Sequence, residues 1–202
     1  MKLETERLIL REPRMSDWKD IVEGIGDLEV SKNLSTVPYP YKKKDAEHWI
    51  KKTIKKWKKR GKEIESYNFL IELKSEKKVI GSIGIPKIDY KNKFCTTGSW
   101  LNKNYHRKGY ITEAKIVLNE FVFNKLKMRK METETFSENT ASNATQKAVG
   151  YKLEGCRQKH HISKATGKIH DENMYGLMKE DWKKVLPKLK KHLKEKIKKL
   201  ER

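Results

Sequence analysis

Residues 94–114 have the sequence FCTTGSWLNKNYHRKGYITEA, in which an extended, partly apolar run leads through a polar loop into a helical pattern. The run ends at Leu101, and apolar residues recur at helical spacing after Gly109. A strand that passes through a glycine-containing loop into a helix gathers unpaired backbone N–H groups and the positive end of the helix dipole at one point. The stretch therefore predicts an anion-binding turn. It matches neither GxxxxGKS/T nor GxGxxG, which argues against a P-loop and a dinucleotide-binding fold.

The rest of the chain alternates between strand-like and helical patterns. Strand-like runs cover residues 6–12, 67–73, 79–88, 94–101, 130–136, 151–162 and 169–178. Helical patterns cover residues 18–23, 46–57, 111–125 and 141–149, and Gly150 follows as a helix stop. Helices interleaved with hairpin pairs predict an α/β fold: a mixed, mostly antiparallel sheet of about seven strands with helices on both faces.

The tail, residues 182–202, differs in composition from the domain predicted for residues 1–181. It reads as a basic C-terminal helix with one apolar ridge, formed by Leu186, Leu189, Leu193, Ile197 and Leu200. Packing of this ridge against the domain is the favoured interpretation. A homodimer seam and a partner-binding arm remain alternatives.

Length and charge bound the class of protein. The 202 residues suit one domain with an appendage, and 48 Lys and Arg against 27 Asp and Glu give a net charge of +21. Segments 42–60 and 183–202 each hold ten basic and two acidic residues, so together they carry +16 of this excess. The excess indicates contact with RNA, a ribosome or a polyphosphate ligand, or else only a lysine-rich composition.

No membrane or metal association is expected. The chain has no run of eighteen apolar residues, and its first twelve residues are too charged for a signal peptide, so a cytoplasmic location is predicted. Cys95 and Cys156 are interpreted as reduced thiols. No CxxC or HxxxH spacing occurs, and adjacent His160 and His161 would point to opposite faces of an extended strand, so no metal site is predicted.

Five motifs occur in an order and at separations that resemble the GNAT acetyltransferases. They are ETERLILR (residues 4–11), GSWL (98–101), YHRKGYITEA (105–114), ENTAS (138–142) and GYKLEG (150–155). The branch that the chain resembles most is that of the ribosomal-protein N-terminal (alanine or serine) acetyltransferases, over roughly residues 1–180. The resemblance implies acetyl-CoA as acetyl donor and a GNAT fold, in which strands 95–101 and 130–136 splay apart around the pantetheine arm.

The resemblance also implies the residues that bind acetyl-CoA. The family's pyrophosphate loop, Arg/Gln-x-x-Gly-x-Gly/Ala, falls on His106, Gly109 and Ile111, so this chain departs from the pattern at two of three positions. Backbone N–H groups do most of the phosphate binding, and binding is expected to survive. The implied cofactor-binding residues are Trp100, Leu101, His106, Arg107, Lys108, Gly109, Tyr110, Ile111, Thr112 and Asn139.

Direct attack of an amine on a thioester requires a proton acceptor, an oxyanion donor and help for the leaving sulfur. Backbone N–H groups at Trp100 and Leu101 suit the oxyanion. Many relatives place a leaving-group Tyr where this chain has Gln146, whereas the resembled branch has a Ser at Ser142, which this chain keeps. Ser142 is therefore the candidate partner of the sulfur, with helix capping as the alternative.

The proton acceptor is the most open assignment. The branch's Glu falls on His161, and a strand carboxylate common in the family falls on Thr96. His161 is the candidate catalytic base, with Asp171, Glu172 and bound water as alternatives. Glu113, in the first turn of its helix, is interpreted as structural.

The predicted function is acetyl transfer from acetyl-CoA to a primary amine, most simply the N-terminus of a protein such as a ribosomal protein. Acetylation of a small-molecule amine, an antibiotic or a polyamine, is the enzymatic alternative. A catalytically weak module that binds acetyl-CoA or RNA is the alternative outside enzymes.

Overall fold

The computed structural model describes residues 1–58 and 64–200; residues 59–63 and 201–202, which include the last two residues of each basic segment, lie outside the described residues. The strands are β1 (Lys2–Glu4), β2 (Leu8–Arg11), β3 (Tyr67–Leu73), β4 (Lys78–Asp89), β5 (Phe94–Leu101), β6 (Lys130–Phe136), β7 (Lys152–Ile162) and β8 (Ile169–Met178). The helices are α1 (Trp18–Ile25), α2 (Leu28–Ser31), α3 (Lys43–Trp57), α4 (Tyr110–Glu120), α5 (Thr140–Val149) and α6 (Lys179–Leu200). Among these helices none is both long and apolar enough to cross a bilayer.

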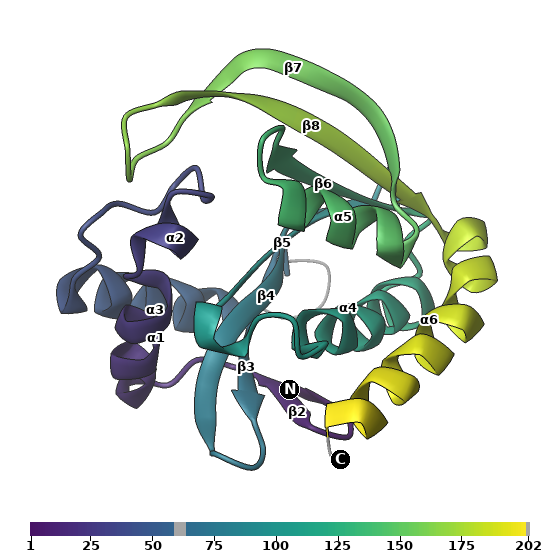
Figure 1. The fold of residues 1–202 in the computed structure, drawn as a ribbon, viewed down its shortest axis with the longest axis horizontal. Helices are drawn as coiled ribbons and strands as arrows, with labels where there is room; N and C mark the ends of the chain where they lie inside the picture. Colours follow the sequence, from purple (N-terminus) through teal and green to yellow (C-terminus); the bar gives the residue numbers. More distant parts are fainter. Residues whose placement is uncertain (59–63, 201–202) are drawn as a thin grey trace.

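The described strands form one eight-stranded sheet in the order β1-β2-β3-β4-β5-β6-β8-β7 (Figure 1). Among the described strands only β5 and β6 pair in parallel, which confirms the mixed α/β sheet. The expected strand count was one too low, because the chain before residue 12 is a hairpin. Its turn is closed by hydrogen bonds from the backbone and side chain of Thr5 to the Leu8 carbonyl, so Lys2–Glu4 folds back on Leu8–Arg11.

Helices cover both faces of the sheet, as predicted. On β3, Phe69 and Ile71 belong to the main core beneath α4 and α6, whereas Leu70, between them, packs with α1, α2 and α3 in a second core. This alternation is the period-two pattern of a strand buried on both sides. Below, these are called the α4 face and the α1 face.

The parallel pair β5–β6 parts halfway along its length. Cα partners run from Phe94 with Lys130 to Thr97 with Thr133 and then stop, although β5 continues to Leu101 and β6 to Phe136. The fork therefore opens toward the carboxyl ends of both strands. This is the splay that the resemblance implies.

The basic tail forms α6, which crosses the outside of α4 (Figure 1). Leu189, Leu193 and Ile197 are buried in the main core, whereas Leu200 is 54% exposed. Most of the apolar ridge is thus used inside the chain, which favours packing over a dimer seam.

Candidate active site

The anion-binding turn predicted between β5 and α4 is formed by two residues in the left-handed region. Gly109, which precedes α4, has φ of +83°, and Arg107 has φ of +60°. Helix geometry leaves the first N–H groups of α4, from Tyr110 to Thr112, without intrahelical acceptors. Successive N–H groups in such a turn form a concave anion site, which fits a diphosphate.

The turn is held from behind by the N-terminal hairpin. Arg7 donates from Nη1 to the Lys108 carbonyl at 3.1 Å and from Nε to the Glu113 carboxylate at 2.8 Å. Glu113 also accepts from the Arg7 backbone N–H at 3.0 Å and from Thr5 Oγ1 at 2.5 Å. The Tyr110 ring stacks on the Arg7 guanidinium, whose Cζ lies 4.3 Å from the ring centroid. Glu113 is therefore structural, because its oxygens are engaged by the hairpin.

Helix α6 closes the same turn from another side. A Cβ placed on Gly109 would lie 3.0 Å from Leu193 Cδ1 and 3.6 Å from Lys196 Cδ. Glycine is thus favoured here by its backbone conformation and by the close approach of α6.

The expected oxyanion donors at Trp100 and Leu101 point in different directions. The Asn102 N–H donates to the Ile80 carbonyl on β4 at 2.8 Å. In an antiparallel ladder every second residue turns its N–H and C=O to the same neighbour, so the Trp100 amide also faces β4 and the Leu101 amide faces the fork. The geometry favours Leu101 as the oxyanion donor.

His106 contacts the end of β5. The Leu101 carbonyl lies 2.9 Å from His106 Nε2, so His106 holds the strand end rather than presenting this ring nitrogen to a phosphate.

Buried hydroxyls line the fork where the two strands separate. Thr97 Oγ1 lies 3.2 Å from the Tyr151 hydroxyl, and Thr133 Oγ1 donates to the Thr97 carbonyl at 3.0 Å. Burial raises the pKa of Tyr151, which keeps this hydroxyl neutral. These bonds fix the point at which pairing ends.

A buried lysine that the sequence analysis missed lies beside Ser142. Lys115 Nζ donates to Gln146 Oε1 at 3.2 Å, and Gln146 Nε2 faces Ser142 Oγ at 3.5 Å. Burial lowers the pKa of Lys115 to about 8. A signal was present in the sequence, because Lys115 falls on the apolar stripe between Ile111 and Leu118. Gln146, at the position of the family's tyrosine, thus links a cation to the candidate hydroxyl.

The start of α5 is fixed by two asparagines. Asn139 Oδ1 accepts the Ser142 N–H at 3.1 Å, so Asn139 is the helix cap and its amide nitrogen is left for other contacts. Asn143 Oδ1 accepts from the Tyr175 hydroxyl at 2.7 Å and from Asn173 Nδ2 at 2.8 Å. These bonds place α5 and Ser142 on the α4 face.

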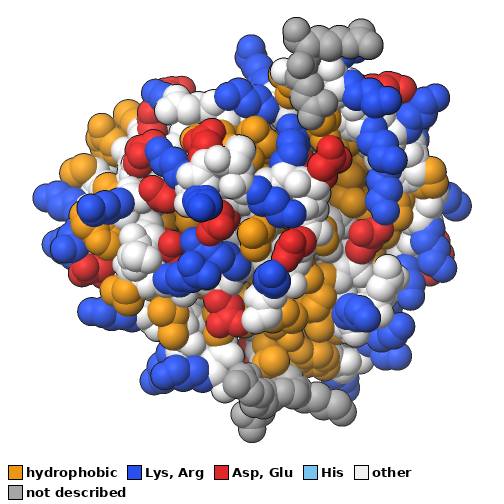
Figure 2. Space-filling model, turned by 90° about the horizontal axis from the view of Figure 1, so that it is seen from below, with side chains coloured by type: hydrophobic (Ala, Val, Ile, Leu, Met, Phe, Trp, Pro, Cys, Tyr) orange, Lys and Arg blue, Asp and Glu red, His pale blue; other side chains and the backbone are white. Residues whose placement is uncertain are grey.

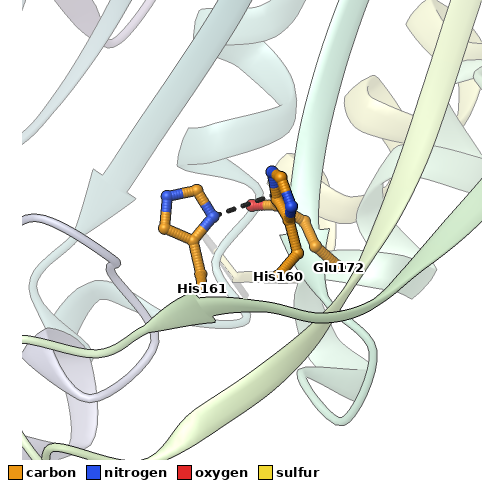
Figure 3. A group of neighbouring side chains, drawn as sticks. All are labelled: His160, His161 and Glu172. Atoms are coloured by element: carbon orange, nitrogen blue, oxygen red, sulfur yellow. Dashed lines mark hydrogen bonds and ion pairs between the residues drawn. The ribbon is translucent and has the colours of Figure 1, made fainter.

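His161 lies on the opposite side, where its Nδ1 is 3.1 Å from Oε2 of Glu172 (Figure 3). The Glu172 side chain is only 6% exposed, so this carboxylate orients the imidazole and leaves Nε2 turned away from it. Because β8 is regular here, Glu172 points away from Asn173 and Tyr175, toward the α1 face. His161 and Ser142 therefore flank the sheet from opposite faces, and no described contact joins them.

The prediction that His160 and His161 point apart is wrong. The β7–β8 register shifts between Arg157 and His161, and Lys159 takes a φ of +47°. This bulge turns both rings to one carboxylate, with His160 Nε2 3.8 Å from Glu172 Oε2. A two-residue period does not hold across a bulge.

Further carboxylates share the α1 face with Glu172. Glu132 and Glu134 alternate along β6 with buried Met131 and Thr133, and they bind Lys130 and Arg157 at 3.0 Å. Thr96, where the family has a carboxylate, is the register partner of Glu132. Together with Glu172 these carboxylates form an acidic strip, in which Lys130 and Arg157 pair with Glu132 and Glu134.

The β7–β8 hairpin arches over this face toward the segment after α2 (Figure 1). At its tip, the Lys164 N–H donates to the Ser35 carbonyl at 3.2 Å. This bond joins the hairpin tip to the segment after α2.

The site combines a fork between two parallel strands, an anion-binding turn at the start of α4 and a polar group on each face of the sheet. An enzyme that binds acetyl-CoA and transfers its acetyl group to an amine has these features. Residues 7–152 match the model described as "Acetyltransferase (GNAT) domain", and the chain belongs to this family. It is an acetyl-CoA-dependent N-acetyltransferase.

Individual relatives agree with this assignment. "Uncharacterized N-acetyltransferase p20" of Bacillus licheniformis is 28% identical over 180 residues, which are 89% of this chain and 97% of the relative. The Microcin C7 self immunity acetyltransferase MccE, solved with acetyl-CoA and AMP, has a TM-score of 0.72 at 22% identity over 86% of this chain and 93% of its own. RimL, a ribosomal L7/L12 alpha-N-protein acetyltransferase, has a TM-score of 0.75 at 19% identity over 88% and 94%. Both structural likenesses concern the fold.

Proposed function

We propose that the acceptor is the N-terminal amine of a protein, such as a ribosomal protein, and that it reaches the fork from the α1 face. The contact between His161 Nδ1 and the buried Glu172 carboxylate carries this proposal, because it fixes a proton acceptor on the face opposite α5. A donor held from the α4 face and an acceptor held from the α1 face would meet at the parted strands.

Each group has one task in this mechanism. Acetyl-CoA supplies an electrophilic thioester carbonyl and a thiolate leaving group. His161 Nε2 takes a proton from the incoming ammonium, and Glu172 stabilises the imidazolium formed. The Leu101 N–H donates to the developing oxyanion. Ser142, supported by Gln146 and Lys115, donates a hydrogen bond to the departing sulfur.

Charge supports a cationic acceptor. The acidic strip of Glu132, Glu134 and Glu172 offers carboxylates to an ammonium group, which competes with Lys130 and Arg157 for the first two. A protein substrate suits this arrangement, because only its N-terminal amine has to reach His161. RimL, which shares the fold, is named as an acetyltransferase of a ribosomal-protein N-terminus, and this precedent agrees with the proposed acceptor.

The acidic strip also favours a second candidate, a small polyamine acceptor. Its local attraction opposes the repulsion that the +21 molecule exerts on a free polycation. The two candidates differ in whether a peptide chain must follow the amine.

Thiol release from acetyl-CoA tests the acceptor class with peptides that begin with Ala or Ser, the same peptides with blocked N-termini, a polyamine and an aminoglycoside. We expect turnover with the free peptides only. His161→Ala is expected to lower kcat by about 10²–10³-fold, the usual contribution of a general base, whereas His48→Ala, an exposed histidine of α3, should not change it. Turnover with the polyamine alone, or full activity of His161→Ala, would contradict the proposal.

A further inference from the structure

The bulge in β7 brings together three metal-ligating side chains, of which His160 has no role in the proposed reaction. His160, His161 and Glu172 each offer one ligand atom, and these three atoms all lie within 4.8 Å of one another. The separations to Glu172 are 3.8 Å and 3.1 Å. Zn²⁺ binds nitrogen and oxygen ligands at about 2.0–2.1 Å in tetrahedral geometry, so the ligand atoms lie about 3.4 Å from one another. The observed separations are close to this value, and small side-chain movements would complete the site.

We propose that His160, His161 and Glu172 bind a divalent transition-metal ion, with Zn²⁺ as the fitting occupant, and that the bound ion blocks acetyl transfer. The blocking effect rests on the proposed role of His161, because a metal on this imidazole fixes its tautomer and occupies the space beside it. The binding itself depends only on the geometry of the three side chains.

The donor set and its accessibility fit Zn²⁺. Two imidazoles and one carboxylate form a common open zinc site, in which a fourth position remains for water. The His160 and His161 side chains are 42% and 35% exposed, so an ion enters from solvent, while the anionic ligand Glu172 is desolvated. Oxygen-preferring Mg²⁺ is excluded by the two nitrogen donors.

The backbone that creates the site is strained. Lys159 holds a left-handed conformation, with a φ of +47°, that is unfavourable for a non-glycine residue, and its N–H donates to Asp171 Oδ1 at 2.7 Å. A regular strand would avoid this strain but would send His160 away from Glu172. Strain of this kind persists where the local geometry has a use.

The Arg157 guanidinium opposes binding of the metal ion. Arg157 Nη1 lies 3.4 Å from His160 Nε2 and 3.0 Å from Glu134 Oε1. Metal binding has to displace Arg157 from the ring nitrogen, and Glu134 is placed to hold the displaced guanidinium. Arg157→Gln is therefore expected to tighten metal binding.

The binding test titrates the 202-residue chain, free of any purification tag, with Zn²⁺ by calorimetry and with Co²⁺ by its visible absorption. We expect one site per chain with the Co²⁺ absorption of a site with mixed nitrogen and oxygen ligands. His160→Ala and Glu172→Gln should each weaken binding by at least about tenfold, whereas His192→Ala, an exposed histidine of α6, should not. Binding by His160→Ala with wild-type affinity and spectrum would overturn the proposal.

An activity assay separates the metal site from the role of His161. We expect saturating Zn²⁺ to abolish acetyl transfer by the wild type, and His160→Ala to keep its basal turnover and to resist the ion. If Zn²⁺ binds through His160 but leaves turnover unchanged, the metal site stands and His161 is not the proton acceptor.

Discussion

Gly109 is the residue on which the cofactor turn depends most directly. Its φ of +83° disfavours a side chain, and a Cβ at this position would lie 3.0 Å from Leu193 Cδ1, so Leu193 would have to shift. Gly167, in the β7–β8 turn, has a φ of +69° with nothing within 4 Å of such a Cβ. The two glycines therefore separate backbone strain from the effect on cofactor binding.

We expect Gly109→Ala to lower the free energy of unfolding by about 1–2 kcal/mol or more and to weaken acetyl-CoA binding. Gly167→Ala should lower the free energy of unfolding through backbone strain and leave acetyl-CoA binding unchanged. Urea unfolding and calorimetric titration with acetyl-CoA measure both quantities. Equal acetyl-CoA affinity in Gly109→Ala and the wild type would contradict the role of this turn.

Lys115 makes stability depend on pH in a defined window. Burial lowers its pKa from 10.5 to about 8, so between these values the unfolded chain binds one more proton than the folded chain. The free energy of unfolding should therefore rise with pH in this window. One pKa unit corresponds to about 1.4 kcal/mol, which gives a contribution on the order of 3 kcal/mol.

The comparison with Lys115→Met isolates this contribution, because other titrating groups are common to both proteins. From pH 7.5 to pH 10.5 the wild type should gain stability relative to the variant, measured by urea unfolding. A constant difference would show that Lys115 is not desolvated.

Among the elements, α6 links the main core to the cofactor turn. Leu193 is 9% exposed and contacts the Gly109 position, whereas Leu200, two turns further along the same helix, is 54% exposed. We expect Leu193→Ala to cost about 2–5 kcal/mol of stability and to weaken acetyl-CoA binding.

Leu200→Ala is the matched control, and a change within about 0.5 kcal/mol is expected for it. Thermal unfolding with and without acetyl-CoA measures both the loss of stability and the loss of acetyl-CoA binding. If Leu193→Ala were as stable as Leu200→Ala, the tail would not be part of the core.

For the whole molecule, the positive charge is dispersed. The two most basic helices, α3 and α6, lie on different parts of the molecule (Figure 1), and Figure 2 shows Lys and Arg side chains spread over one face with Asp and Glu between them. Dispersed charge drives non-specific, salt-sensitive association with polyanions rather than recognition of a shape.

We expect a ribosomal RNA fragment to bind and its affinity to fall steeply as salt rises from 50 to 200 mM, by about tenfold or more. Replacement of the exposed Lys184, Lys188, Lys191 and Lys198 of α6 by Gln should reduce the slope of log affinity against log salt. Fluorescence anisotropy at several salt concentrations measures this slope. A flat response would leave composition alone as the origin of the charge.

Local pattern was sufficient for most elements of this protein. The limits of β3, β5, β6 and β8 follow from runs bounded by polar turns, and the anion-binding turn follows from one glycine between a strand and a helix. The resemblance supplied the fork and the candidates Ser142 and His161. Each of these features is determined by residues close together in the sequence, or is recognised from a short sequence motif.

Contacts between distant segments were decided only by the folded chain. Lys115 acquires its environment from Gln146, 31 residues away, and Glu172 orients His161 from the next strand. The hairpin before residue 12 and the bulge at Lys159 depend on hydrogen bonds to one carbonyl and one carboxylate. Period and propensity describe a segment in isolation, whereas burial, pKa and the direction of a side chain at a bulge are set by the groups that tertiary packing brings against it.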